Sequence, residues 1–208
     1  MQSGVVVLHD LLKFVRSNWK HHDAMNLMSP ASKPYRRLCK EIAEEIPASQ
    51  GFYLWGYYEK NGLWRNIYLG KAGLGKTANL KGRILEELKD ERCCFWSDVY
   101  SEAKLLELGP EVHSNRTQWY KTIKKQWQRS LREAGTTHIV WARTPHLSND
   151  DVKRIEADLI EAMNPEANRQ RTTPPPEQVL QEDTAEVFRL FRKRVHEHRC
   201  DRLRKSPL

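Results

Sequence analysis

The chain has 208 residues, of which 39% are hydrophobic and 30% are charged, so one domain with appendages and a modest core is expected. Lysine and arginine number 35 against 27 aspartate and glutamate, and the net charge of +8 favours a polyanionic partner such as nucleic acid. We expect no signal peptide and no membrane-spanning helix, because no run of about 18 apolar residues occurs. Four cysteines without a CxxC pair indicate a reduced compartment, so a cytoplasmic location is expected, nucleoid-associated when DNA is bound.

Two helices are predicted before residue 51. The first covers residues 5–20, where apolar residues recur on one face: Leu8, Leu11, Leu12 and Val15. The second covers Tyr35 to Ile46 and is ended by Pro47, after which residues 47–51 look like a linker. We therefore expect residues 1–50 to form a helical N-terminal extension.

A β-hairpin is predicted directly after this extension. Residues 51–58 are rich in strand-forming residues, and Asn61-Gly62 is the strongest signal for a tight turn. Residues 64–69 then form the returning strand, antiparallel to the first. The next helix is expected over residues 78–91 and carries Arg83.

The rest of the chain divides into an insertion, a strand and two helices. Residues 92–134 are interpreted as an insertion whose end is a basic helix over residues 117–133. A third strand is predicted at residues 137–142, and a helix capped by Ser148 or Asn149 runs to Met163. After a proline-rich break at residues 172–176, a last helix ends in a basic tail that begins at Arg189. The expected units are residues 1–50, residues 51–171 with the insertion at about 92–134, and residues 172–208.

Five residues stand out through their order and spacing. Taken alone, a tyrosine on a strand most often belongs to the core, and an arginine or glutamate on a helix is most often solvated. The ordered set is Tyr53 in Gly51-Phe52-Tyr53, Tyr68 in Tyr68-Leu69-Gly70-Lys71, Arg83 in Asn79-Leu80-Lys81-Gly82-Arg83, then Glu156 and Asn168. This set resembles the GIY-YIG nuclease family over residues 51 to about 169. Its last two elements are similar to the nuclease domain of the excision-repair protein UvrC.

The resemblance implies both a fold and an activity. The implied fold is α+β, a small three-stranded antiparallel sheet with helices on both sides and helical extensions at each end. The implied activity is hydrolysis of phosphodiester bonds in DNA with one Mg²⁺ or Mn²⁺ per active site. Since the extensions resemble those of compact restriction enzymes, we expect a restriction, defence or mobile-element role. Cutting both strands would then require a homodimer or a transient dimer on DNA.

The resemblance also implies a role for each member of the set. Glu156 binds the metal, Arg83 holds a phosphate oxygen through its planar fork of donors, and Asn168 orients the metal side. The implied catalytic residues are Tyr53, Tyr68, Lys71, Arg83, Glu156 and Asn168. Phosphodiester hydrolysis needs a proton acceptor, stabilised charge on phosphorus and help for the leaving oxygen. These side chains are therefore expected to converge on one pocket.

One of the two phenols would take the proton from water. Tyr53 is favoured as this base with Tyr68 as its hydrogen-bonding partner, although the sequence leaves the choice between them open. A phenol has a reference pKa of about 10, so a nearby cation must lower it, and Lys71 or Arg83 is available for this.

Three departures from the family pattern are present. The interval between Tyr53 and Tyr68 is longer than usual, and residues 73–77 are added before Arg83. Glu87 stands one turn after Arg83, where many members carry histidine or tyrosine. A second base or phosphate contact is therefore in doubt, and a catalytically inactive DNA-binding protein on a nuclease scaffold remains an alternative.

Basic and polar residues outside the catalytic set are expected to contact the DNA backbone. They lie in the glycine-rich loop, at the start of the next helix and on the basic helix of the insertion: Lys76, Asn79, Lys81, Lys121, Lys124, Lys125 and Arg129.

Residues 70–77 support a different function. They match the phosphate-loop pattern G-x4-G-K-[ST] and follow a strand, which would suggest a nucleotide hydrolase. However, no later apolar strand ends in an aspartate to hold Mg²⁺, and the preceding element is a hairpin rather than a strand–helix–strand unit. The P-loop hydrolase is therefore the alternative, and the nuclease is the main prediction.

Overall fold

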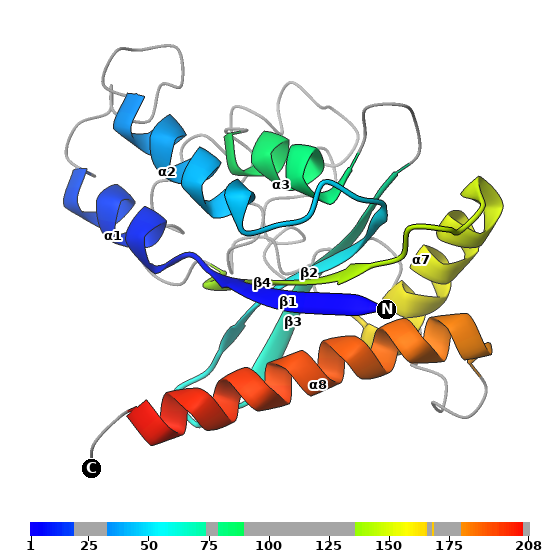
Figure 1. Cartoon of the computed structure of the whole chain (residues 1–208). Helices are drawn as coiled ribbons and strands as arrows, with labels where there is room; N and C mark the ends of the chain where they lie inside the picture. Colours follow the sequence, from blue (N-terminus) through cyan, green and yellow to red (C-terminus); the bar gives the residue numbers. More distant parts are fainter. Residues whose placement is uncertain (19–32, 74–78, 90–135, 166–167, 169–179, 206–208) are drawn as a thin grey trace, which may run out of the picture.

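The computed structural model describes residues 1–18, 33–73, 79–89, 136–165, 168 and 180–205, and Figure 1 shows how their helices and strands are arranged. The predicted insertion at residues 92–134, its basic helix and the proline-rich break at residues 172–176 lie outside these described residues. Within the described residues the fold is a mixed α+β arrangement of one antiparallel sheet and flanking helices.

The sheet has four strands in the order β1-β4-β2-β3, and every pairing is antiparallel. They are β1 (Gln2–Val7), β2 (Gly51–Tyr58), β3 (Trp64–Ala72) and β4 (His138–Arg143). The prediction of three strands was wrong, because β1 adds a fourth beside β4. The predicted β2–β3 hairpin is confirmed. Its register shifts once between Trp55 and Gly56, and the bulge accommodates one extra residue of β3.

The strand that was not predicted, β1, lies at the start of the chain, where residues 5–20 were predicted to be helical. The helix α1 (His9–Asn18) begins only after a strand that contains three consecutive valines. Valine has a stiff β-branched side chain that favours strands. Val5 pairs with Val140 and Val6 with Ile139, so a partner more than 130 residues away selects the extended conformation. Residues 2–7 thus belong to the sheet instead of a helical extension.

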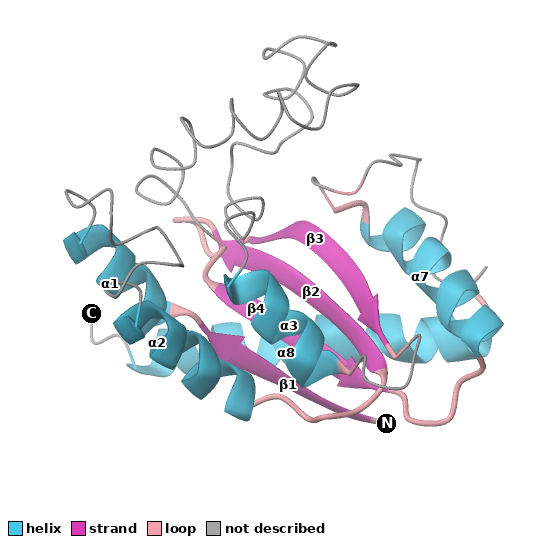
Figure 2. Ribbon diagram, turned by 90° about the horizontal axis from the view of Figure 1, so that it is seen from above, coloured by secondary structure: helices cyan, strands magenta, loops and turns pink. Residues whose placement is uncertain are grey.

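Helices cover both faces of the sheet (Figures 1 and 2). On one face lie α1, α2 (Lys33–Glu44) and α3 (Leu80–Lys89), and on the other lie α7 (Asn149–Met163) and α8 (Glu182–Lys205). The helices predicted at residues 35–46 and 78–91 are present as α2 and α3, with α2 two residues earlier and α3 described over residues 80–89, and the helix predicted up to Met163 is confirmed with Ser148 as its N-cap. Alternate residues of β2 face opposite layers, which separates the core into two clusters.

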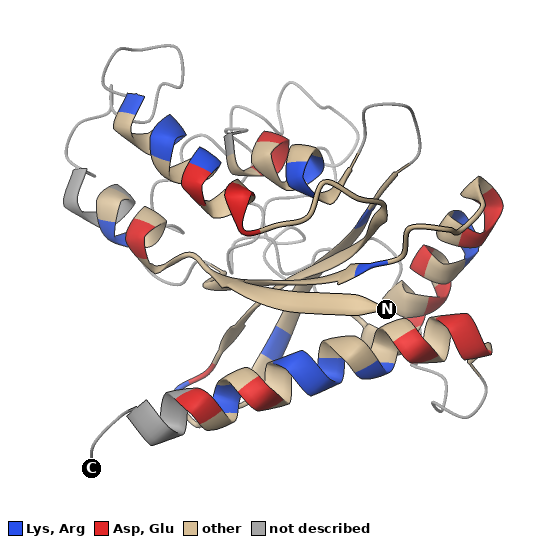
Figure 3. Ribbon diagram, viewed as in Figure 1, with Lys and Arg blue, Asp and Glu red and all other residues tan. Residues whose placement is uncertain are grey.

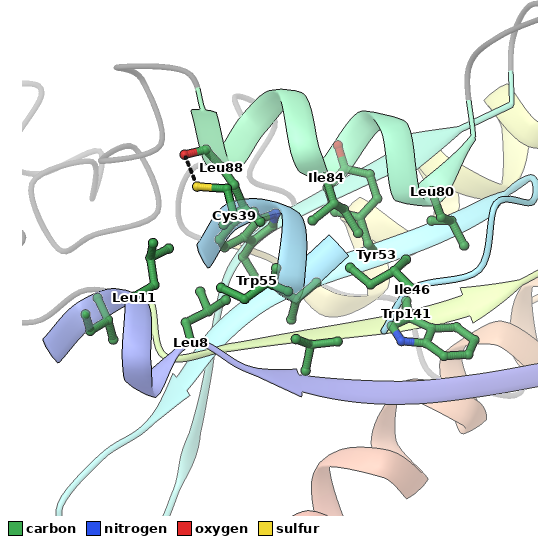
Figure 4. Packing of buried hydrophobic residues seen from close by; sticks show 14 of the residues in the cluster. Leu8, Leu11, Cys39, Ile46, Tyr53, Trp55, Leu80, Ile84, Leu88 and Trp141 are labelled. Carbon is green, nitrogen blue, oxygen red and sulfur yellow. Dashed lines mark hydrogen bonds between the residues drawn. The ribbon is translucent and has the colours of Figure 1, made fainter. Parts of the chain in front are cut away.

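The first cluster joins the sheet to α1, α2 and α3, and Figure 4 shows its packing. Tyr53 and Trp55 enter it from β2. The carbonyl oxygen of Leu88 on α3 accepts hydrogen bonds from the Tyr35 hydroxyl at 2.7 Å and the Cys39 thiol at 3.6 Å, which ties α2 to α3. This layer places α3 against β2 and β3.

The second cluster joins the opposite face to α7 and α8. Val187 and Phe191 of α8 are fully buried there with Ile155 and Leu159 of α7. The expected basic tail is part of α8, which continues as a helix to Lys205. Figure 3 shows charged residues on the helices and few on the strands. None of the helices in the described part of the chain is long and apolar enough to cross a membrane.

Candidate functional site

Two phenols lie side by side on neighbouring strands, facing α3. The rings of Tyr53 on β2 and Tyr68 on β3 have centroids 6.2 Å apart and are tilted by 50°. Tyr53 is fully buried, whereas Tyr68 is only partly buried. The two hydroxyl groups also interact, because Tyr53 slightly lowers the otherwise raised pKa of Tyr68. Of the two, Tyr68 is therefore the phenol that water or a substrate can reach.

Glu87 on α3 accepts hydrogen bonds from three side chains around it. Its Oε1 lies 2.5 Å from the Tyr53 hydroxyl and 3.0 Å from Arg83 Nε, and its Oε2 lies 3.2 Å from Trp55 Nε1. Only 7% of Glu87 is exposed, so the carboxyl is held inside the first cluster. The residue that departs from the family pattern is thus the centre of a buried polar network. The sequence carried a signal for this: Glu87 falls on the same helical stripe as Leu80, Ile84 and Leu88, all of which are buried.

Burial changes the acid–base properties of this network. It raises the pKa of Glu87 to about 7, with the hydrogen bond from Tyr53 and the charge of Arg83 opposing the shift. Burial, and then the charge of Glu87, raise the pKa of Tyr53 well above 10. The same two causes raise the pKa of Tyr68 to about 12, although Arg83 opposes them. The buried Tyr53 already donates its proton to Glu87, so its surroundings argue against the favoured role of base.

Arg83 links the network to the surface. Its Nε lies between Glu87 Oε1 and the Tyr53 oxygen, which is 3.4 Å away, and 46% of its side chain is exposed. Glu86 Oε2 lies 3.9 Å from its Nη1, a distance at which an exposed pair contributes little. The buried end of the guanidinium is thus fixed, and its outer end faces solvent, where a phosphate could bind.

Glu156 lies on α7, on the opposite face of the sheet from the phenols. It forms an ion pair with Lys71 of β3, and both side chains are about one-fifth exposed, at 20% and 22%. Lys71 pairs across the hairpin with Phe52, which belongs to the second cluster, so Lys71 points toward the α7 face. The expected convergence on a single face is therefore not what the structure shows.

The two groups approach each other around the edge of β3. This strand ends the strand order, so no further strand of the described residues separates its two faces on that side. The charge of Glu156 contributes to the raised pKa of Tyr68, which places the two side chains within electrostatic range. The structure thus brings Tyr53, Tyr68 and Arg83 together on one face and Lys71 with Glu156 on the other, and of these residues Tyr68 and Lys71 lie on the edge strand β3.

Asn168 binds the outer edge of β3. Its Oδ1 accepts a hydrogen bond from the Leu69 backbone N–H at 2.8 Å, and its Nδ2 donates to the Leu69 carbonyl oxygen at 2.9 Å. Both polar groups of this edge residue are therefore satisfied by one side chain. This geometry makes Asn168 a support for the strand that carries Tyr68 and Lys71.

The residues expected to contact DNA are only partly described. Asn79 accepts a hydrogen bond from Gly82 N at 2.8 Å at the start of α3, and Lys81 forms an ion pair with Glu44 at 2.6 Å. Asn79 therefore caps the first turn of α3, and Lys81 pairs with α2 at the surface. The remaining candidates lie outside the described residues: Lys76, Lys121, Lys124, Lys125 and Arg129.

The donor set limits what metal could bind. Among the residues that the structure describes, no group of three or more histidine, cysteine, aspartate or glutamate side chains is placed to hold a metal ion. A lone carboxylate such as Glu156 suits a hard cation that keeps most of its waters, as Mg²⁺ does. The Lys71 ammonium group is paired with this carboxylate, and the ion pair would have to break before such an ion could bind.

The phosphate-loop alternative fits the described residues poorly. The first residues of the pattern, Gly70 to Ala72, are paired with β2 inside β3 instead of forming a loop after the strand. All strand pairings of the described sheet are antiparallel, whereas nucleotide-binding folds of this type use a parallel sheet. Residues 74–78 lie outside the described part.

Comparison of the chain with family models, curated proteins and solved structures yields no match in any of the three.

Proposed function

We propose that this chain is a divalent-metal-dependent DNA endonuclease of the GIY-YIG type. The observation that carries the proposal is the arrangement at the outer edge of β3: a partly exposed phenol, a guanidinium with a fixed inner end, and a carboxylate within electrostatic range of that phenol. A charge of +8 adds a general attraction for a polyanion.

Each residue of this arrangement has a separate role in the proposed phosphodiester hydrolysis. The outer nitrogens of Arg83 bind a non-bridging phosphate oxygen and stabilise the charge that develops on phosphorus. Tyr68 faces the attacking water and hydrogen-bonds to it. Glu156 would hold one Mg²⁺ or Mn²⁺, which when bound would neutralise phosphate charge and assist the leaving oxygen. Lys71, released from Glu156, would remain near the phosphate as a second cation.

A plasmid-cleavage assay with Mg²⁺ or Mn²⁺ tests this function. Glu156→Gln should lower the cleavage rate by at least about a hundredfold, because the carboxylate is the implied metal ligand. Glu161→Gln is the matched control, since Glu161 is an exposed residue of the same helix, and it should cut like the wild type. Sequencing the cut ends would report specificity and whether both strands are cleaved, as a restriction-type dimer requires.

Other outcomes would support other functions. Tight DNA binding without cleavage under either metal would indicate a DNA-binding protein that lacks catalysis. Hydrolysis of ATP that is lost in Lys76→Ala would indicate a nucleotide hydrolase. Equal cleavage by the wild type and Glu156→Gln would refute the role of Glu156.

A further inference from the structure

Glu87 is a buried carboxyl that the proposed hydrolysis does not yet use. It accepts hydrogen bonds from Tyr53, Trp55 and Arg83, at 2.5 to 3.2 Å. A buried carboxylate is costly unless it is paired in this way. A glutamine or leucine would fill similar space without introducing a charge. The site therefore holds a titratable group directly behind the two phenols.

The hydroxyls form a chain from the surface to this carboxyl. Tyr68 is partly exposed and its ring lies 6.2 Å from that of Tyr53, with which its hydroxyl interacts, and the Tyr53 hydroxyl donates to Glu87 Oε1. Each phenol can accept one hydrogen bond and donate another. The chain is thus continuous from the edge of β3, where a water can approach, to the interior of the first cluster.

We propose that Glu87 is a positioning residue that receives, through Tyr68 and Tyr53, the proton lost by the attacking water. Water gives its proton to the Tyr68 oxygen as its own oxygen bonds to phosphorus and the bond to the leaving oxygen breaks. Tyr68 passes its hydroxyl proton to Tyr53, and Tyr53 passes its proton to Glu87. Both phenols end neutral, and Glu87 changes from carboxylate to carboxylic acid. The bond that breaks leaves the negative charge on the leaving oxygen, which takes the proton of the new P–OH group, so the products are an alcohol and a phosphate with one more negative charge.

This route removes the difficulty that a phenol is a weak base at neutral pH. The pKa of Tyr68 is raised to about 12, so its phenolate is scarce near pH 7. The pKa of Glu87 is raised by burial to about 7, so in roughly half of the molecules at that pH the carboxylate is ionised and can accept a proton. Neither phenol has to remain ionised, because each gains one proton as it loses another.

The charged and titratable groups around Glu87 come from four elements and, at longer range, a fifth. Arg83 on α3 holds it directly, and the exposed Glu86 lies 3.9 Å from Arg83. Tyr35 and Cys39 of α2 donate to the carbonyl of the neighbouring residue Leu88. Among the described residues this set is Arg83 and Glu86 from α3, Tyr53 from β2, Tyr68 from β3, Tyr35 and Cys39 from α2, and Glu156 from α7, which acts on Tyr68. Within the described part of the chain, Arg83 is the cation paired with the carboxyl, its Nε 3.0 Å from Oε1.

The inference rests on the proposed function and is tested by the pH dependence of cleavage. For the wild type, kcat/KM should rise about tenfold per pH unit below a midpoint near 7. Glu87→Gln keeps the size of the side chain but cannot take a proton, so the rate at pH 8 should fall about a hundredfold and the midpoint should disappear. Glu87→His restores a titratable acceptor and should recover at least a tenth of the rate with an acidic limb. Glu86→Gln, 77% exposed in its side chain, is the matched control and should keep the wild-type profile.

A second measurement does not depend on cleavage. In NMR of protein labelled with carboxyl-¹³C glutamate, one signal of the wild type should titrate with a midpoint near 7 and should be absent from Glu87→Gln. If Glu87→Gln does not fold, Tyr53→Phe is the second variant. It removes the hydroxyl between Tyr68 and Glu87 and should shift the midpoint of this signal. A Glu87 signal with a midpoint below 5 overturns the inference, as does a Glu87→Gln variant with the wild-type pH profile. A wild type that never cleaves DNA with either metal overturns the proposed function, and the proton route with it. The first two results contradict the proton route alone.

Discussion

Gly70 of β3 lies directly opposite Tyr53 of β2, and a methyl group built on Gly70 would stand 2.4 Å from the Tyr53 phenolic oxygen. The same methyl group would lie 2.9 Å from a ring carbon of Tyr68. The glycine of the second sequence motif therefore makes the space in which both phenols lie. Its role is to admit the ring of Tyr53, because any larger residue would occupy the same volume.

Gly70→Ala should displace Tyr53 and break its hydrogen bond to Glu87. Overpacking of this kind lowers the free energy of unfolding by about 1–3 kcal/mol, measurable by urea denaturation. In a Tyr53→Ala background the added methyl group has room, so Gly70→Ala should then have little effect. An equal loss of stability in both backgrounds would show that the ring of Tyr53 is not the cause.

The sequence predicted the hairpin, four of the helices and the residues on the two motif strands, since these depend on local periodicity and turn chemistry. It missed β1, because the leucine stripe after Leu8 has helical spacing and the pairing of β1 with β4 is non-local. It also placed Glu156 and Tyr53 in one pocket, whereas α7 packs on the face away from Tyr53. Motif order does not reveal which face of a sheet a later helix covers.

The protonation of Glu87 should make stability fall as the pH rises. Its pKa is raised from 4.5 in the unfolded chain to about 7 in the folded protein, so the folded state binds this proton more tightly. The resulting stabilisation is fully present below pH 4.5 and is lost as the pH rises through 7, a change of roughly 3 kcal/mol.

Urea unfolding at several pH values measures this effect by comparison with Glu87→Gln. The stability of the variant relative to the wild type should improve steadily between pH 4.5 and 8, because glutamine has no proton to lose. Glu86→Gln controls for the loss of a glutamate on the same helix and should run parallel to the wild type. A constant difference between Glu87→Gln and the wild type would rule out the raised pKa.

Asn168→Ala should loosen the outer edge of β3. It removes both hydrogen bonds to the Leu69 backbone, each contributing about 1 kcal/mol. Hydrogen exchange of the Leu69 amide should accelerate about tenfold, and the melting temperature should fall. Asn168→Asp keeps the acceptor for the Leu69 N–H but loses the donor to its carbonyl, so it should protect that amide better than alanine does. Unchanged exchange in both variants would show that this clamp does not hold the strand in solution.

Lys71 competes with any cation for Glu156, so removing its charge should strengthen metal binding. The ion pair is partly buried, with side-chain exposures of 22% and 20%, and an incoming Mg²⁺ or Mn²⁺ must break it. Lys71→Met keeps the aliphatic stem without the ammonium group, and we expect Mn²⁺ to bind about fivefold to tenfold more tightly by calorimetry, equivalent to about 1 kcal/mol. Glu156→Gln should abolish this binding in both backgrounds, which assigns the heat to that carboxylate. If Lys71→Met bound Mn²⁺ no better than the wild type, Glu156 would have to be abandoned as the ligand, because relieving the competing ammonium can only favour a cation at that oxygen.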